Sequence, residues 1–304
     1  MWTAIAIGLL LGVACVAGYP AAVLSLMRFR LRQACKLQES TVTVDGMRWS
    51  YLIGGQGPTL VLLPGLGGNK YQWGLPFLRL AAHHRVIALD LPGGGGTSGR
   101  MDLDCTPERL ANHVARVLDR LGVQSFTLIG ASIGGYVAGH LAAQCGSRVE
   151  TLVLMNPAGL TADEHTPVVA SFLTSGRHPF SYSSVAEMDA LYEVLFNKPP
   201  SMPMALKRYL ARRNEKYIED REMLLHGLRR AGLGGLSAAL SGFHGRVLLI
   251  WGRDDKLLHG ASVSALVKAA PHSQVVEVRD CGHLPYMERP DICIREVTRF
   301  LNAA

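Results

Sequence analysis

From about residue 40 onward, short apolar runs alternate with segments in which apolar residues recur at helical spacing. An opening hairpin is expected where Thr41–Val44 and Trp49–Leu52 flank the turn pair Asp45-Gly46. The runs expected as buried strands are Thr59–Leu63, Arg85–Leu89, Phe126–Ile129, Thr151–Met155, Val247–Trp251 and Gln274–Val278. Strands that are apolar throughout indicate a sheet covered on both faces, so the pattern predicts an α/β protein with a mostly parallel central sheet and flanking helices.

The clearest predicted helix runs from Thr106 to Leu121, with Thr106 as its N-cap, Pro107 in the first position and Gly122 after its end. Between residues 159 and 244 the strand pattern stops. The helical runs there are Val168–Leu173, Val185–Phe196, Met204–Lys216 and Arg221–Leu228. We therefore predict a core formed by residues 37–158 and 245–304, with a helical cap of residues 159–244 inserted over the strand ends.

The amino-terminal segment has the pattern of a membrane element. No charged side chain occurs from Trp2 to Met27, and Trp2–Tyr19 would span about 27 Å as a helix, close to the thickness of a hydrocarbon core. Pro20 is expected to kink or end that helix. Residues 1–36 are therefore predicted to be a retained transmembrane anchor and a juxtamembrane helix. Two alternatives stay open: a signal peptide cleaved near Val16-Ala17-Gly18, and lipidation of Cys15.

Composition and charge support a membrane-associated globular protein. Hydrophobic residues make up 48% of the chain and charged residues 18%, which excludes a disordered protein. The net charge of +7 includes a basic cluster of Arg28, Arg30, Arg32 and Lys36, and no long basic stripe follows it, so nucleic acid is not expected as a partner. The positive-inside rule favours a cytoplasmic catalytic body, although that rule can be overridden and the side of the membrane stays open.

A catalytic nucleophile is predicted at Ser132. The segment Gly130–Gly134 reads G-x-S-x-G and lies between a predicted strand and a predicted helix. A tight strand-to-helix turn needs small residues on either side of the serine and presents its hydroxyl at a helix amino terminus. The match in this context indicates a nucleophilic serine rather than an accidental turn.

Such a serine needs a base and an acid that orients the base, in the chain order Ser, Asp or Glu, His. The last predicted strand leads into Gly282-His283-Leu284-Pro285, which makes His283 the candidate base. The strand before it leads into Asp254 and Asp255, of which Asp255 is favoured.

Backbone N–H groups must also stabilise the oxyanion of an ester-hydrolysis intermediate. Ile133 N–H follows the nucleophile, and Leu66 N–H lies in the glycine-rich loop Pro64–Gly68 after a predicted strand. A phosphate-binding role for that loop is the alternative, but its spacing fits neither a P-loop nor a dinucleotide fingerprint.

Across about residues 40–302 the chain resembles the α/β-hydrolase family. The motifs that carry the resemblance are Leu63–Gly68, Asp90–Gly93, Gly130–Gly135, Trp251–Asp255 and Gly282–Pro290. The resemblance implies an α/β-hydrolase fold and places the acid on Asp255. More narrowly, the chain looks like the membrane-anchored monoacylglycerol lipases and the bacterial membrane-anchored lipases and phospholipases A. Two departures are Pro64, where the family usually has histidine, and His259, where it often has proline.

The expected activity is hydrolysis of carboxylic acyl esters of lipids through an acyl-enzyme, with no cofactor and no metal. A carbon–carbon bond hydrolase or cofactor-free haloperoxidase is the alternative, and a non-catalytic binding protein is a third. The substrate and the bilayer are the expected partners, and a homodimer stays open. Residues expected to contact the substrate are Gly65, Gly67, Ala131, Phe172, Leu173 and Phe196.

Overall fold

An eight-stranded sheet forms the centre of the molecule in the computed structural model, which describes the backbone of residues 2–99, 105–160 and 165–303 and the side chains from residue 19 onward within these ranges. The strands are β1 (Leu37–Val44), β2 (Met47–Gly54), β3 (Thr59–Leu63), β4 (Arg85–Leu89), β5 (Phe126–Ala131), β6 (Val149–Met155), β7 (Arg246–Gly252) and β8 (Gln274–Val278). Their order in space is β1-β2-β4-β3-β5-β6-β7-β8. Only the β1–β2 and β2–β4 pairs of these strands are antiparallel, so the predicted mostly parallel sheet is confirmed.

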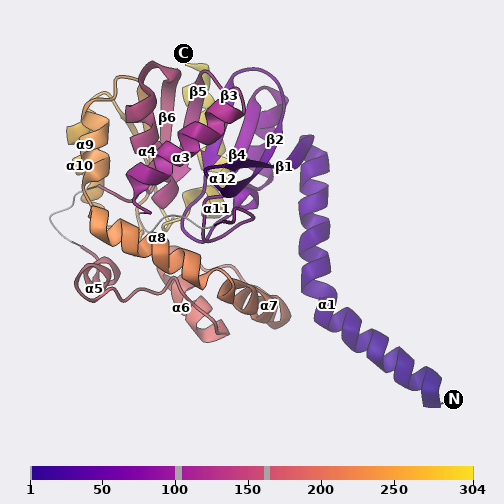
Figure 1. The fold of residues 1–304 in the computed structure, drawn as a ribbon. Helices are drawn as coiled ribbons and strands as arrows, with labels where there is room; N and C mark the ends of the chain where they lie inside the picture. Colours follow the sequence, from indigo (N-terminus) through magenta and orange to yellow (C-terminus); the bar gives the residue numbers. More distant parts are fainter. Residues whose placement is uncertain (1, 100–104, 161–164, 304) are drawn as a thin grey trace.

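Helices cover both faces of this sheet (Figure 1). The shorter helices and turns of the core are α2 (Gly74–Leu78), η1 (Lys70–Trp73), η2 (Arg79–Ala82), η3 (Gly146–Arg148) and α11 (Pro285–Glu288). The longer ones are α3 (Pro107–Arg120), α4 (Ile133–Cys145), α10 (Ser262–Ala269) and α12 (Pro290–Asn302). Alternate residues of each strand enter two separate hydrophobic clusters: Val61 packs in one that contains residues of α3 and α4, whereas Leu60 packs in another with α2 and α12. The sheet is therefore buried on both sides, which explains its uninterrupted apolar strands.

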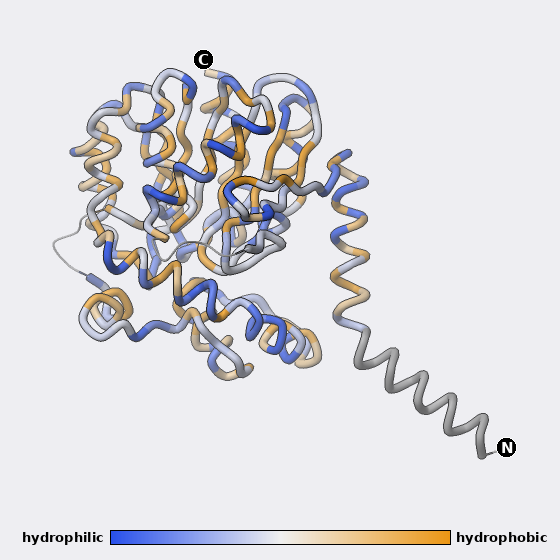
Figure 2. The backbone as a smooth tube through the Cα atoms, viewed as in Figure 1, coloured by the Kyte–Doolittle hydropathy of each residue, from blue (hydrophilic) through white to orange (hydrophobic). Residues whose placement is uncertain are grey.

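The opening hairpin forms as predicted. Asp45 and Gly46, with φ of 53° and 74°, connect β1 to β2 through the left-handed conformation that two-residue hairpin turns require. Colouring by hydropathy shows hydrophobic residues concentrated in the strands and mixed character along the helices below them (Figure 2).

In the described part of the segment between β6 and β7 there are five helices: α5 (Pro167–Ser175), α6 (Val185–Leu195), α7 (Met204–Glu215), α8 (Ile218–Ala231) and α9 (Gly235–Ser241). Four of them, α5 to α8, gather beyond the carboxyl ends of the parallel strands (Figure 1). We call these four the inserted helices. The fifth, α9, packs against α4 on the face of the sheet.

The first helix, α1 (Trp2–Cys35), continues through Pro20, so the proline does not end it. In the part of the chain whose side chains are described, no helix combines the length and hydropathy needed to cross a bilayer. The predicted membrane span Trp2–Tyr19 lies outside that part except for its last residue.

Candidate active site

Ser132 occupies the tight turn between β5 and α4. Its backbone has φ 53° and ψ −123°, a conformation that residues with a side chain adopt rarely. The turn depends on Gly134, because a Cβ there would lie 2.3 Å from the backbone oxygens of both Leu63 and Pro64. The small residues of the motif thus allow the loop after β3 to pass directly beside the serine.

His283 and Asp255 form a hydrogen-bonded chain with this serine. The distance from His283 Nε2 to Ser132 Oγ is 2.9 Å, and the distance from His283 Nδ1 to Asp255 Oδ2 is 2.8 Å. The three residues follow β5, β7 and β8, whose carboxyl ends meet at one edge of the sheet. A hydroxyl, an imidazole and a carboxylate in this order can transfer the hydroxyl proton to the ring and stabilise the imidazolium that results.

The choice between the two aspartates is clear in the geometry. Asp255 Oδ1 accepts hydrogen bonds from the N–H groups of Leu257 and Leu258 at 2.8 and 3.0 Å. Asp254 instead accepts from Cys281 N–H at 3.1 Å. It is therefore Asp255 that contacts the histidine.

Asn156 completes the surroundings of Asp255. This residue is fully buried, its Nδ2 donates to Asp255 Oδ2 at 2.6 Å, and its Oδ1 accepts from Gly252 N–H at 2.9 Å. Asn156 belongs to no catalytic motif in the sequence. In the sequence, its position directly after the strand Thr151–Met155, where some α/β hydrolases carry the acid, is a signal that points to it; in the structure its backbone has φ 40°.

The two backbone N–H groups expected to stabilise an oxyanion belong to residues close to Ser132. Ile133 is the first residue of α4, so its N–H has no acceptor within the helix. Leu66 borders two cavities together with Ser132, and no described residue accepts from its N–H. The adjacent Gly65 is in close contact with the serine, since a Cβ on it would lie 3.2 Å from Ser132 Cβ.

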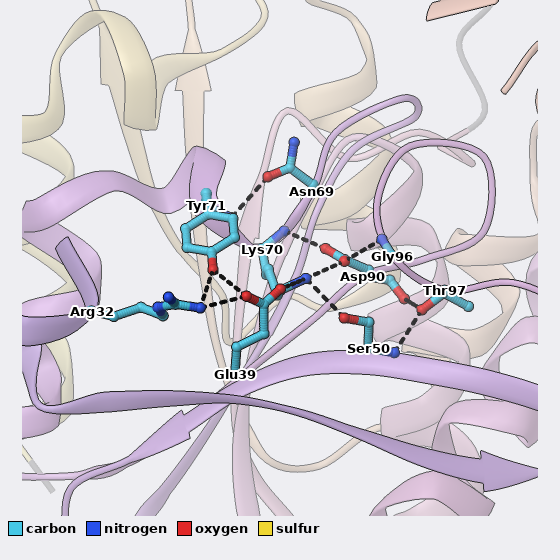
Figure 3. A network of polar contacts seen from close by, with 9 residues as sticks. All are labelled: Arg32, Glu39, Ser50, Asn69, Lys70, Tyr71, Asp90, Gly96 and Thr97. Atoms are coloured by element: carbon cyan, nitrogen blue, oxygen red, sulfur yellow. Dashed lines mark hydrogen bonds and ion pairs between the residues drawn. The ribbon is translucent and has the colours of Figure 1, made fainter. Parts of the chain in front are cut away.

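A buried polar network fixes the segment that follows this loop (Figure 3). Lys70 Nζ donates to Asp90 Oδ2 at 2.6 Å and to Ser50 Oγ at 2.8 Å, and Lys70 N–H donates to Asp90 Oδ1 at 2.6 Å. Asp90 also accepts from Gly96 N–H, and Lys70 pairs with Glu39 at 2.9 Å. The network ties the segment after β3 to β1, to β2 and to the end of β4.

Two cavities meet at Ser132. The larger, of about 250 Å³, has uncharged polar side chains in its lining, among them Asn69, Gln72 and Asn214, and is also lined by Phe196. The smaller, of about 50 Å³, is lined almost entirely by apolar side chains, including Phe172 from α5. Both cavities lie between the sheet edge and the inserted helices.

The residues predicted to contact the substrate divide between these cavities and the core. Gly65 and Gly67 line the larger cavity, as does Phe196, and Phe172 lines the smaller one. Ala131 is buried within the sheet and Leu173 packs against the core, and neither contributes to either cavity.

Glu288 is a further residue that the sequence motifs did not assign a role. Its carboxylate accepts from Gly282 N–H at 2.7 Å and from Asn197 N–H at 2.9 Å. In addition, His283 N–H donates to the carbonyl of Leu195 at 2.9 Å. These bonds hold the histidine loop against the carboxyl end of α6.

Cys281 is the other nucleophilic side chain near the histidine. Burial raises the pKa of its thiol well above the usual range, so the sulfur stays protonated and unreactive at neutral pH. Among the described residues, no group of three or more His, Cys, Asp or Glu side chains is arranged to hold a metal ion.

Comparison with known proteins agrees with this architecture. Residues 58–290 match the family described as the alpha/beta hydrolase fold. Monoacylglycerol lipase ABHD6 of Mus musculus is 26% identical over 98% of this chain and 92% of its own length. A protein solved as a membrane phospholipase A, a bacterial virulence factor, superposes with a TM-score of 0.90 at 28% identity, covering 99% of this chain and 97% of the other.

The dihydrolipoyllysine-residue acetyltransferase component of an acetoin cleaving system from Cupriavidus necator is 31% identical over 81% of this chain. The chain spans 64% of the length of that protein. The resemblance found in the sequence motifs is thus confirmed over most of the chain, and the protein belongs to the α/β-hydrolase family.

Proposed function

We propose that this protein hydrolyses acyl esters of membrane lipids through an acyl-enzyme on Ser132, while held at the bilayer by its amino-terminal helix. The observation that carries the proposal is the hydrogen-bonded chain from Ser132 through His283 to Asp255, which opens on two cavities of different polarity. The relatives show that the chain is a carboxylic ester hydrolase of the lipase and esterase type.

The reaction proceeds in two steps. His283 Nε2 accepts the proton of Ser132 Oγ as the oxygen attacks the ester carbonyl, and the N–H groups of Leu66 and Ile133 stabilise the resulting oxyanion. The intermediate collapses, the imidazolium gives its proton to the departing alcohol, and the acyl group stays on Ser132. A water molecule then attacks the acyl-enzyme with His283 again as base, which releases the fatty acid.

The two cavities support an assignment of the two halves of the ester. An acyl chain has no hydrogen bonds to satisfy, and the smaller cavity offers apolar side chains such as Phe172, Leu225 and Leu228. The alcohol half carries hydroxyl or phosphoryl oxygens, for which Asn69, Gln72 and Asn214 of the larger cavity are suitable partners. We therefore assign the first carbons of the acyl chain to the smaller cavity, which at about 50 Å³ holds a short stretch of chain, and the alcohol to the larger one.

The inserted helices act as the cap in this proposal, within the segment of residues 159–244. They supply apolar walls to both cavities, and the bonds of Glu288 to the backbone after α6 attach them to the histidine loop. The charge-free run Trp2–Met27 serves as the membrane anchor, with Arg28 and Arg30 at the surface of the bilayer.

The test is ester hydrolysis by the full-length protein in detergent, compared with Ser132→Ala and with Ser264→Ala, which changes an exposed serine on α10. Substrates are p-nitrophenyl esters of graded chain length, monoacylglycerol and phospholipid. The proposal predicts hydrolysis by the wild type and Ser264→Ala and none by Ser132→Ala. Hydrolysis of vinylogous diketones but of no ester would instead support a carbon–carbon bond hydrolase.

A further inference from the structure

Arg221 on α8 is a buried cation without an anionic partner. Its side chain is 2% exposed, and its guanidinium donates to three neutral oxygens: the carbonyl oxygens of Phe180 and Gly93 and Oδ1 of Asn214. No carboxylate within the described residues forms an ion pair with it: Glu222, whose charge acts on Arg221 from a distance, pairs with His178 instead. The Nε–H of Arg221 has no acceptor there. Three of the five N–H donors of the guanidinium are therefore used, all by uncharged groups.

Such an arrangement is costly for a fold. Charged side chains are almost never fully buried unless they are paired, because removal from water is compensated only by an opposite charge. Burial lowers the pKa of Arg221, which means that the surroundings disfavour the charged form. A guanidinium stays protonated in proteins nonetheless, so a permanent positive charge is held in a site where no carboxylate of the described residues contacts it.

The charge lies on the wall of the larger cavity. Arg221 lines that cavity together with Ser132 and His283. Gly67 covers the face of the guanidinium, since a Cβ on Gly67 would lie 3.2 Å from its Cζ, Nε and Nη2 atoms. The segment Gly65–Gly67 therefore contacts Ser132 at one end and Arg221 at the other.

No other residue in the described lining of this cavity carries a permanent charge. The remaining polar side chains include Asn69, Gln72, Asn214 and Tyr182, which are neutral at physiological pH. A cavity with one buried cation and no carboxylate attracts anions and disfavours cations.

We propose that Arg221 recognises the phosphate group on the alcohol half of the substrate, so that the enzyme prefers lysophospholipids and phospholipids to neutral acylglycerols. This inference rests on the proposed function, which places the alcohol half in the larger cavity. A guanidinium suits phosphate oxygens because its N–H donors lie in a rigid planar fork, of which Nε–H and one N–H of Nη1 are not used by the three neutral acceptors. The three neutral acceptors hold that fork in place before the substrate arrives.

The test compares two substrates that share one acyl chain: 1-acylglycerol 3-phosphate and the corresponding monoacylglycerol. In the wild type the ratio of kcat/KM for the phosphate ester to that for the neutral ester should exceed one. Arg221→Gln should lower kcat/KM for the phosphate ester about 10- to 100-fold, the range for loss of a hydrogen bond to a charged group, and change the value for the neutral ester about threefold or less. Arg221→Lys should give an intermediate ratio, because it keeps the charge without the fork.

Arg120→Gln is the matched control, because it removes the same charge from an exposed position on α3. The ratio of the two kcat/KM values is independent of the fraction of folded enzyme, so a purely structural role for Arg221 would lower both values equally. That result, or a wild type that prefers the neutral ester, would overturn the inference. Ser132→Ala tests the proposed function separately. The wild type should hydrolyse both esters, and Ser132→Ala should hydrolyse neither.

Inhibition of the wild-type enzyme gives a second test, which does not depend on whether the variants fold. Glycerol 3-phosphate should inhibit hydrolysis of a neutral p-nitrophenyl ester competitively, at concentrations at which glycerol has no effect. Inorganic phosphate should inhibit less, because it lacks the glycerol part that the neighbouring amides contact. Equal inhibition by glycerol and glycerol 3-phosphate would contradict the inference, and stronger inhibition by dicarboxylates would assign Arg221 to a carboxylate instead.

Discussion

Asn156 connects the carboxylate of Asp255 to the sheet through a single amide group. Its Nδ2 is 2.6 Å from Asp255 Oδ2 and its Oδ1 is 2.9 Å from the N–H of Gly252. Because the amide is fully buried, water cannot replace either bond when the side chain is removed. The orientation of Asp255 toward His283 therefore depends on a residue that takes no part in proton transfer.

Substitution of Asn156 by alanine should lower kcat about 10- to 100-fold, the equivalent of the roughly 1.5–3 kcal/mol that a hydrogen bond to a charged group contributes. KM should change little, since no substrate atom contacts the amide. Asn302→Ala, at an exposed position near the end of α12, is the control. Steady-state kinetics with a p-nitrophenyl ester would measure the effect, and a variant with the wild-type kcat would show that Asp255 needs no such support.

The sequence predicts the catalytic residues unequally well. Ser132 and His283 lie in short motifs next to strands, where local spacing is enough to identify them. Asp255 required the family pattern, because Asp254 occupies an equally suitable turn. The contact of Asn156 with Asp255 and the role of Arg221 could not be predicted, since they depend on partners 99 positions away for Asn156 and 128 for Arg221.

At the scale of elements, a buried ion pair positions the segment after β3 in addition to the turn of the loop itself, in which Gly68 N–H donates to the carbonyl of Gly65 at 3.0 Å. Lys70 and Asp90 have side chains that are 4% and 0% exposed, and they join at 2.6 Å. Removing one partner of such a pair leaves a buried charge without compensation, which costs more than the pair itself contributes.

Replacement of Lys70 by methionine should therefore lower the free energy of unfolding by about 3–5 kcal/mol. Lys207→Met offers a matched comparison, because the Lys207–Asp189 pair joins at 2.8 Å with side chains 21% and 44% exposed. That change should cost about 1 kcal/mol or less. Denaturant titration of both variants would measure the difference, and equal losses would contradict the importance of the buried network.

Helix α4 carries a partly buried histidine, His140, that makes the free energy of unfolding depend on pH. Burial lowers the pKa of His140, so this side chain is neutral in the folded protein at pH values where it would be protonated in the unfolded chain. The unfolded state then binds more protons as the pH falls below about 6.5, and the free energy of unfolding decreases.

Thermal unfolding between pH 8 and pH 5 should show this decrease, and His140→Gln should reduce the slope. His226→Gln, which changes an exposed histidine on α8, should leave the slope as in the wild type. The remaining slope in His140→Gln is expected to come from His84, whose pKa burial also lowers. An identical slope in all three proteins would refute the assignment to His140.

The elements themselves were largely predictable, because strands covered on both faces must be apolar and helices need one apolar face. Each expected strand is present within a few residues of its predicted bounds. Two features of the helices were harder to predict from the sequence. Helix α9 is short and contains Gly235 among small residues, so it has little periodic signal, and it is stabilised by packing against α4. Pro20 removes only one donor from α1, and the helix continues past it.

At the scale of the whole molecule, α1 is joined to the body near the active-site loop. Arg32 Nη1 donates to Glu39 Oε2 at 2.6 Å, and Tyr71 OH donates to the same oxygen at 2.8 Å (Figure 3). The guanidinium of Arg28 lies 5.0 Å from the centre of the Tyr71 ring. The helix that we propose to hold the protein at the membrane thus contacts the segment that follows Leu66.

Deletion of residues 1–18 should release the protein from the membrane fraction, because it removes most of the charge-free run. Hydrolysis of a water-soluble p-nitrophenyl ester should persist, since Arg32 and its contacts remain. Fractionation of cells that express either form, with full-length Ser132→Ala as a control that stays with the membrane, would test this. A truncated protein found in the membrane fraction would show that another segment binds the bilayer.

The central claim is that the acyl group passes through Ser132, and the most direct test is to trap it there. The full-length protein would be mixed with excess p-nitrophenyl ester, quenched in acid within milliseconds, digested and examined by mass spectrometry. The claim predicts one acyl group on the peptide that contains Ser132, and none on that peptide in Ser132→Ala. Hydrolysis that continues without an acylated peptide, or in the Ser132→Ala protein, would contradict it.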